Sequence, residues 1–251
     1  MSRQGLTDFT LQNCSLAELR VESYNKEVGD LKGYDCSVCK NKGMIAVIRE
    51  EDGEDIYRQC DCLEIRRALR RVNDSGLKEL IAEKRFETFN ILDETYQQVI
   101  DKAKAYAEDP NGWFVMDGKS GTGKTHICTA IVGKLLANGM PCKYMLWREE
   151  APVLKAKASD PEYGLLIKPY KEAKCLYIDD LFKGGITQGD LNLAFEIINH
   201  RYLKGLLTII STEKFITEIL ELDEAIGGRI YEMAKSNLIQ IKNWKNYRLM
   251  K

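Results

Sequence analysis

Short apolar runs alternate with amphipathic segments from residue 113 onward. Runs rich in β-branched and aromatic residues are typical of buried parallel strands, and strands that alternate with helices predict a three-layer α/β domain with a parallel sheet. The clearest helix carries an apolar stripe at Leu191, Ala194, Phe195, Ile198 and Tyr202. The strands are expected at residues 113–116, 143–147, 175–178, 206–210 and 238–241.

The pattern before residue 113 is different. Ser15 and Glu18 form a capping-box motif, which predicts a helix that starts there and ends near Val28. Two short strand-like runs, at residues 44–48 and 55–59, flank a turn-forming Glu-Asp-Gly and predict a hairpin.

The 37 Lys and Arg residues nearly balance the 38 Asp and Glu residues, for a net charge of -1. This balance excludes a strongly basic protein that coats nucleic acid. No apolar stretch resembles a secretory signal or approaches a bilayer span, so we expect a cytoplasmic protein without membrane contact. The eight cysteines are then expected to be reduced, buried or metal-bound rather than paired in disulfides.

A G-x-x-x-x-G-K-[ST] phosphate loop follows the first strand of the α/β domain and leads into a helix. Its glycines let backbone N–H groups point at phosphate oxygens, and the helix N-terminus adds its positive dipole end. Lys124 is expected to neutralise the β- and γ-phosphates of ATP, and Thr125 to ligate Mg²⁺. The residues expected to bind the cofactor are Gly118, Lys119, Ser120, Gly121, Thr122, Gly123, Lys124 and Thr125.

Two adjacent acids, Asp179 and Asp180, follow the third strand of this domain. We expect Asp179 to hold Mg²⁺ through water and Asp180 to orient or deprotonate the attacking water. The second position of this acidic pair, here Asp180, is usually a glutamate in such sites, and aspartate is one methylene shorter. Hydrolysis is therefore expected to be slow or to depend on a partner.

Two further residues complete the expected catalytic set. Thr212 ends the fourth strand at the sheet edge where ligands bind, and is the expected γ-phosphate sensor. Arg229 stands in an otherwise apolar helical segment, from which a guanidinium can reach the γ-phosphate of a neighbouring subunit. A surface arginine paired with a local acid is the alternative for Arg229.

In order and spacing, four motifs resemble the ATPase module of DnaC/DnaI-type replicative helicase loaders, including phage and prophage members. They are the phosphate loop, Ile-Asp-Asp-Leu at 178–181, Thr-Ile-Ile-Ser-Thr-Glu at 208–213 and Asp-Glu-Ala-Ile-Gly-Gly-Arg at 223–229. The resemblance covers roughly residues 86–248. It implies a AAA+ fold with strand order 5-1-4-3-2 and a trans-acting role for Arg229. Because the sequence ends soon after the fifth expected strand, we do not expect the helical lid common to other AAA+ proteins.

Four cysteines stand in two pairs, Cys36-x-x-Cys39 and Cys60-x-Cys62, on either side of the expected hairpin. Two thiolate pairs brought together make the tetrahedral cage that Zn²⁺ favours, and zinc would stabilise a region too small for a core of its own. Reduced or redox-active thiols are the alternative. The resemblance to DnaI-type loaders implies an N-terminal zinc-binding region that contacts the helicase.

Basic and aromatic side chains mix at the end of the chain, a pattern suited to single-stranded DNA, although a solvated tail fits it equally. The residues are Lys242, Trp244, Lys245, Tyr247, Arg248 and Lys251. His126 is interpreted as an ordinary residue of a first helical turn.

These observations predict a helicase-interaction domain at residues 1–85, with the zinc hairpin at 36–62, and a AAA+ ATPase domain at residues 86–251. The expected function is ATP-dependent loading of a hexameric replicative DNA helicase onto single-stranded DNA, with self-association through the ATPase domain. A transposase-helper (IstB-like) ATPase is the near alternative. A P-loop kinase and a zinc adaptor that binds nucleotide without hydrolysing it are the others.

Overall fold

The computed structural model describes residues 15–250, and Lys251 therefore lies outside the described residues. The chain divides into two compact units that meet between Arg70 and Arg71. No helix within residues 15–250 is long and apolar enough to cross a bilayer.

The first unit contains one helix and a β-hairpin. Helix α1 (Leu16–Lys26) starts at the predicted capping box, with the Ser15 hydroxyl accepting from the Glu18 N–H and the Glu18 carboxylate accepting from the Ser15 N–H. Strands β1 (Met44–Ile48) and β2 (Asp55–Gln59) pair antiparallel at the predicted positions. The connecting turn closes through a 2.9 Å hydrogen bond from the Gly53 N–H to the Arg49 carbonyl.

Three short elements lead to the large domain. Helix α2 (Cys62–Ser75), which contains the boundary between the units, is followed by α3 (Lys78–Glu83) and by the 3-10 turn η1 (Phe86–Thr88). Gly76 separates α2 from α3 with a left-handed φ of 78°, which a glycine adopts without strain.

A five-stranded parallel sheet forms the centre of the second unit, with strand order β4-β5-β6-β3-β7. Numbered within this domain the order is 2-3-4-1-5, so the predicted order 5-1-4-3-2 is confirmed, read from the opposite edge. The strands are β3 (Phe114–Gly118), β4 (Cys142–Leu146), β5 (Cys175–Leu181), β6 (Leu207–Thr212) and β7 (Leu238–Ile241).

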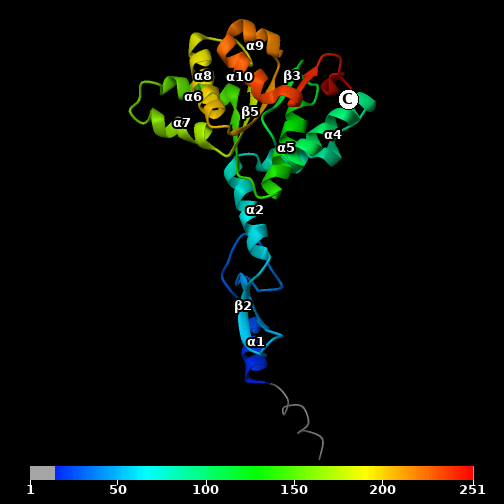
Figure 1. Ribbon diagram of the computed structural model, residues 1–251, viewed down its shortest axis with the longest axis vertical. Helices are drawn as coiled ribbons and strands as arrows, with labels where there is room; N and C mark the ends of the chain where they lie inside the picture. Colours follow the sequence, from blue (N-terminus) through cyan, green and yellow to red (C-terminus); the bar gives the residue numbers. More distant parts are fainter. Residues whose placement is uncertain (1–14, 251) are drawn as a thin grey trace, which may run out of the picture. The chain divides into compact units, whose positions relative to one another are not determined.

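Helices cover both faces of this sheet, because successive strand residues point to opposite sides. Phe114 and Met116 pack with α4 (Glu94–Glu108) and α5 (Lys124–Ala137), whereas Val115 packs with the helices of the other face. The two helical layers lie on opposite sides of the sheet in Figure 1. The second layer contains α6 (Trp147–Ala156), α7 (Tyr163–Glu172), α8 (Gln188–Leu203), α9 (Ile216–Leu222) and α10 (Glu224–Ala234). Short 3-10 turns, η2 (Lys235–Asn237) and η3 (Tyr247–Leu249), complete the domain.

The predicted apolar stripe of α8 is partly wrong. The helix buries Ala194 and Ile198 as expected, but Phe195 is 37% exposed, and Leu193 and Ile197 take its place against the sheet. Apolar residues occur almost all round α8, so periodicity alone did not choose the buried face. Arg201 is buried on the same face, where its guanidinium donates to the Thr208 hydroxyl and to the main-chain carbonyls of Tyr170, Ala173 and Leu207.

Candidate functional site

The phosphate loop connects β3 to α5 and curls back at its glycines. Gly118, Gly121 and Gly123 have φ values of 140°, 77° and 91°, which side-chain-bearing residues rarely adopt. Gly123 caps α5, so the first N–H groups of this helix face the loop. A loop of this form is an anion site, because free N–H groups and the positive helix end meet there.

Lys124 is only 5% exposed and donates to two carbonyls of its own loop, at 2.6 Å from Gly118 O and 2.8 Å from Lys119 O. Burial lowers the pKa of Lys124, and the nearby carboxylates of Glu213 and Asp180 oppose that shift. The ammonium group thus lies inside the loop with hydrogen bonds that phosphate oxygens can replace.

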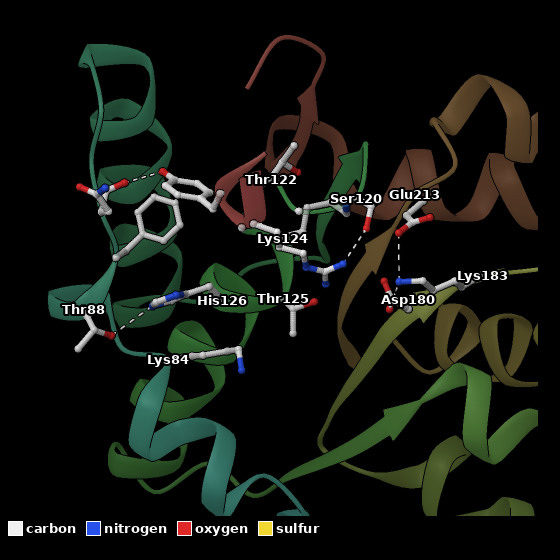
Figure 2. A pocket seen from close by; sticks show the side chains of 16 residues that line it. Lys84, Thr88, Ser120, Thr122, Lys124, Thr125, His126, Asp180, Lys183 and Glu213 are labelled. Carbon is white, nitrogen blue, oxygen red and sulfur yellow. Dashed lines mark hydrogen bonds and ion pairs between the residues drawn. The ribbon is translucent and has the colours of Figure 1, made fainter. Parts of the chain in front are cut away.

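A cavity of about 300 Å³ opens on the loop. Its walls come from residues 120–126 of the loop and α5, residues 84 and 88–90 before α4, the ends of β5 and β6 with the residues that follow them, and residues 247 and 248 near the end of the chain. Figure 2 shows Lys124 and Thr125 between His126 on one side and Asp180 on the other.

Asp179 lies at the end of β5, where it is 2% exposed and holds three hydroxyl groups. Its Oδ1 accepts from Thr125 Oγ1 at 3.0 Å and from Ser211 Oγ, and its Oδ2 accepts from Tyr144 OH at 3.0 Å. The structure therefore joins the two residues predicted to hold Mg²⁺. A hydroxyl beside a buried carboxylate is a donor set that suits this hard cation.

Asp180 faces the cavity, although it directly follows the buried Asp179. Its φ of 58° and a bulge between Ile178 and Leu181 break the alternation of the strand, so both carboxylates serve the same sheet edge. A left-handed φ at a non-glycine residue stores strain, and such strain is common at functional sites. The carboxylate of Asp180 pairs with Lys183 Nζ at 2.8 Å.

Glu213 extends this charged group, since Lys183 Nζ also lies 3.1 Å from Glu213 Oε1. Burial alone would raise the pKa of Glu213, but hydrogen bonds from Lys183 and Ser120 and the positive charges of Lys183 and Lys124 together lower it. The cavity therefore contains two carboxylates that share one lysine.

Thr212, the predicted γ-phosphate sensor, is fully buried and is not among the residues that line the cavity. Its hydroxyl donates to the Leu181 carbonyl at 2.8 Å and accepts from the Lys214 N–H at 3.1 Å. The neighbouring residues take the polar positions, with Ser211 on Asp179 and Glu213 in the cavity. The alternation of side chains along the strand explains this difference, because Ser211 and Glu213 point to one side and Thr212 points to the other.

Arg229 lies on α10, outside the cavity of its own chain. Its guanidinium stacks near the rings of Phe195 and Tyr202, at 5.2 and 5.4 Å from their centroids. Its Nε donates to Asn199 Oδ1 at 3.0 Å and its Nη1 to the Ala225 carbonyl at 2.7 Å. No carboxylate within residues 15–250 pairs with it, so the alternative of a locally paired surface arginine does not describe it.

The linker and the chain end are cavity walls that the sequence analysis missed. His126 Nε2 lies 2.8 Å from the Arg85 carbonyl, and the His126 ring meets Phe89 edge-on at 5.1 Å. The ring of Trp244 stacks on Tyr96 at 3.8 Å. The basic and aromatic pattern of the chain end was visible in the sequence, but nothing local showed that its aromatic rings pack inward.

The four cysteines of the first unit form a second candidate site. All are buried, and their sulfur atoms lie within 4.8 Å of one another. The Sγ distances are 3.8 Å for Cys36 and Cys60 and 3.4 Å for Cys39 and Cys62. Zn–S bonds of about 2.3 Å in a tetrahedron separate sulfur atoms by about 3.8 Å, so the cluster fits Zn²⁺.

The thiols of this cluster interact strongly. Burial would raise the pKa of Cys39, but hydrogen bonds from the Gly43 N–H and from the other thiols lower it to about 6. Burial and the hydrogen bond with Cys39 raise the pKa of Cys62 to about 12. Metal binding would remove the protons from these thiols, because cysteine binds a metal ion as the thiolate.

A model of the family described as IstB-like ATP binding protein matches residues 63–249. The chain belongs to this family. The phage-like element PBSX protein XkdC of Bacillus subtilis is 28% identical over 231 residues, which are 85% of this chain and 84% of XkdC. The replicative helicase loader DnaC of Escherichia coli K12 is 26% identical over 189 residues, 71% of this chain and 75% of DnaC.

The crystal structure of the DnaC helicase loader superposes with a TM-score of 0.58 at 20% identity, covering 65% of this chain and all but 1% of that one. With the strand order described above, this likeness shows a AAA+ fold. The predicted fold class and the resemblance to DnaC-type proteins are confirmed.

Proposed function

We propose that this chain is an ATPase that loads a replicative DNA helicase onto single-stranded DNA. The observation that carries the proposal is the cavity on the phosphate loop, which Lys124, Thr125 and Asp180 line and where the Thr125 hydroxyl is bonded to the buried Asp179. The partner class comes from the DnaC relative, which is a replicative helicase loader by name.

In this proposal the N–H groups of the loop and of the first turn of α5 bind the phosphate oxygens. Lys124 exchanges its carbonyl partners for the β- and γ-phosphates. Thr125 and Asp179 would hold Mg²⁺, which neutralises charge on the same phosphates. Asp180, once released from Lys183, accepts a proton from the attacking water, whose oxygen bonds to the γ-phosphorus as ADP leaves.

The first unit is the proposed contact to the helicase. Cys36, Cys39, Cys60 and Cys62 would hold a structural Zn²⁺ that joins α2 to the hairpin. The metal would there stabilise a segment whose buried cluster is limited to these four cysteines.

A transposase-helper ATPase is the second candidate, and the IstB-like family assignment favours it. Its partner would be a transposase on duplex DNA. The four-cysteine cluster favours the loader, because the resemblance to DnaI-type loaders implies an N-terminal zinc-binding region.

A loading assay tests the proposal. The full chain, the hexameric replicative helicase of the same cell and circular single-stranded DNA are mixed, and the helicase that remains on DNA after gel filtration is measured. We expect ATP to increase it, and Lys124→Ala to abolish the increase because the phosphates lose their lysine.

Lys104→Ala is the matched control, since it removes an equal charge from an exposed side chain of α4 that does not line the cavity. It should load like the wild type. If the amount of helicase that remains on DNA were the same with and without ATP, the proposal that the chain is a helicase loader would be overturned. ATP-dependent retention of a transposase on duplex DNA would establish the second candidate instead.

A further inference from the structure

Two carboxylates lie in the cavity where the phosphate chain of a nucleotide is proposed to bind. Asp180 and Glu213 are the acidic residues among those that line it. Figure 2 shows both of them next to Lys183, on one side of Lys124. A carboxylate this close to a phosphate group repels it, because like charges near a partly buried site are only weakly screened. The acidic side of the cavity therefore needs a positive charge before it can accept a nucleotide.

Lys183 supplies this charge to both carboxylates. Its Nζ lies 2.8 Å from Asp180 Oδ2 and 3.1 Å from Glu213 Oε1, and the lysine side chain is only 25% exposed. Burial alone would lower the pKa of Lys183, but hydrogen bonds to the two carboxylates and their negative charges raise it. Lys183 is thus charged at neutral pH, and together with Lys124 it balances Asp180 and Glu213.

The chain after β5 is folded to bring Lys183 to this place. Asp180 and Phe182 have φ values of 58° and 61°, and the Lys183 N–H donates to the Asp180 carbonyl at 3.0 Å. The Phe182 side chain is buried, and its ring meets Trp147 edge-on at 5.6 Å. Two left-handed residues other than glycine in one short turn cost free energy, and they persist where the surrounding structure imposes them. An ordinary surface loop that carries a lysine requires no such conformation.

Hydrogen bonds to β6 fix the same turn beside Glu213. The Asp180 N–H donates to Ser211 Oγ at 3.0 Å, and Thr212 Oγ1 donates to the Leu181 carbonyl at 2.8 Å. Glu213 directly follows these two residues of β6. The pairing of Lys183 with Glu213 is therefore a consequence of how β5 and β6 are joined, and not of a chance contact between two mobile side chains.

We propose that Lys183 is a positioning residue that neutralises Glu213 and Asp180, so that the γ-phosphate of ATP can bind beside them. This inference rests on the proposed ATP site and does not depend on the helicase or on DNA. Glu213 keeps the lysine in place when Asp180 turns to the attacking water. ATP is affected more than ADP, because Asp180 follows the residue that would hold Mg²⁺ near the γ-phosphate, which ADP lacks.

Calorimetric titration of the full chain with ATP·Mg²⁺ and with ADP·Mg²⁺ tests the proposal. Lys183→Met should weaken ATP binding by about 10-fold, as expected for one uncompensated charge near an anion, and ADP binding by less than about 3-fold. Lys183→Gln retains hydrogen-bond donors without the charge and should lose as much ATP affinity, whereas Lys183→Arg should retain the affinity. Lys168→Met is the control, since it breaks an exposed pair with Glu172 outside the cavity and should change neither affinity.

A double variant separates neutralisation from a direct contact with the nucleotide. Glu213→Gln alone should bind ATP at least as tightly as the wild type, because it removes a negative charge from the cavity. Added to Lys183→Met, it should recover most of the lost ATP affinity. A lysine that bonds the phosphates itself, or that only stabilises the fold, gives no such recovery.

Thermal midpoints measured without nucleotide establish that each variant is folded during the titration. Wild-type ATP affinity in Lys183→Gln, equal losses for ATP and ADP, or a loss that Glu213→Gln does not recover would overturn the assignment of Lys183 while the nucleotide site stands. A wild-type chain that binds neither nucleotide would overturn both.

Discussion

Two neighbouring aspartates occupy opposite environments at the residue scale. Asp179 is buried and bonded to three hydroxyl groups, whereas Asp180 faces the cavity and pairs with Lys183. The left-handed φ of Asp180 makes this possible, because a regular strand would turn the two side chains to opposite faces. Aspartate and asparagine tolerate that conformation better than most residues.

The substitution Asp180→Asn tests the role of this carboxylate. It retains the size and the tolerated backbone conformation but removes the base, so ATP turnover should fall by about 100-fold or more while ATP affinity is kept. Phosphate release and calorimetry measure the two quantities. Turnover within about 2-fold of the wild type would exclude Asp180 as the base, and Glu213 would be the next carboxylate to vary.

At the scale of elements, the four clustered cysteines connect segments of the first unit that bury few other side chains. The hairpin strands β1 and β2 are mostly half-buried or exposed, and α1 buries no residue fully. Structure in the first unit is therefore expected to depend on the cysteine cluster, whereas the sheet of the second unit has its own extensive core.

Zinc removal should therefore affect the two units differently. We expect about one zinc per chain by elemental analysis, and a chelator or Cys62→Ser should unfold the first unit without changing ATP affinity. Limited proteolysis reports cleavage before residue 71, and calorimetry reports the affinity. Cys142→Ser, at a buried cysteine outside the cluster, is the control and should retain zinc. A metal-free chain with an equally protected first unit would contradict the zinc assignment.

At the scale of the whole molecule, Arg229 is a predicted catalytic residue that does not reach the nucleotide cavity of its own chain. It is held by Asn199 and by two aromatic rings on α8, and it does not line the cavity of its own chain. Its proposed role therefore requires a second subunit.

Mixing two inactive variants tests this role. Arg229→Ala should bind ATP normally but lose about 1000-fold in stimulated turnover, and Lys124→Ala should not bind ATP. In a mixture, a Lys124→Ala subunit offers its intact Arg229 to the ATP held by an Arg229→Ala subunit, so turnover should exceed that of either variant alone. Normal turnover of Arg229→Ala alone would refute the assignment.

The sequence alone determined the strands, the phosphate loop, the acidic strand end and the two cysteine pairs, because each depends on local periodicity or on fixed spacing within one segment. Only the tertiary structure decided the buried face of α8, the inward turn of the Thr212 hydroxyl and the position of Arg229. It also decided that the basic and aromatic chain end packs on α4 and the phosphate loop. These features depend on contacts between residues distant in the chain, such as Trp244 with Tyr96, and no local pattern encodes which partner a side chain meets.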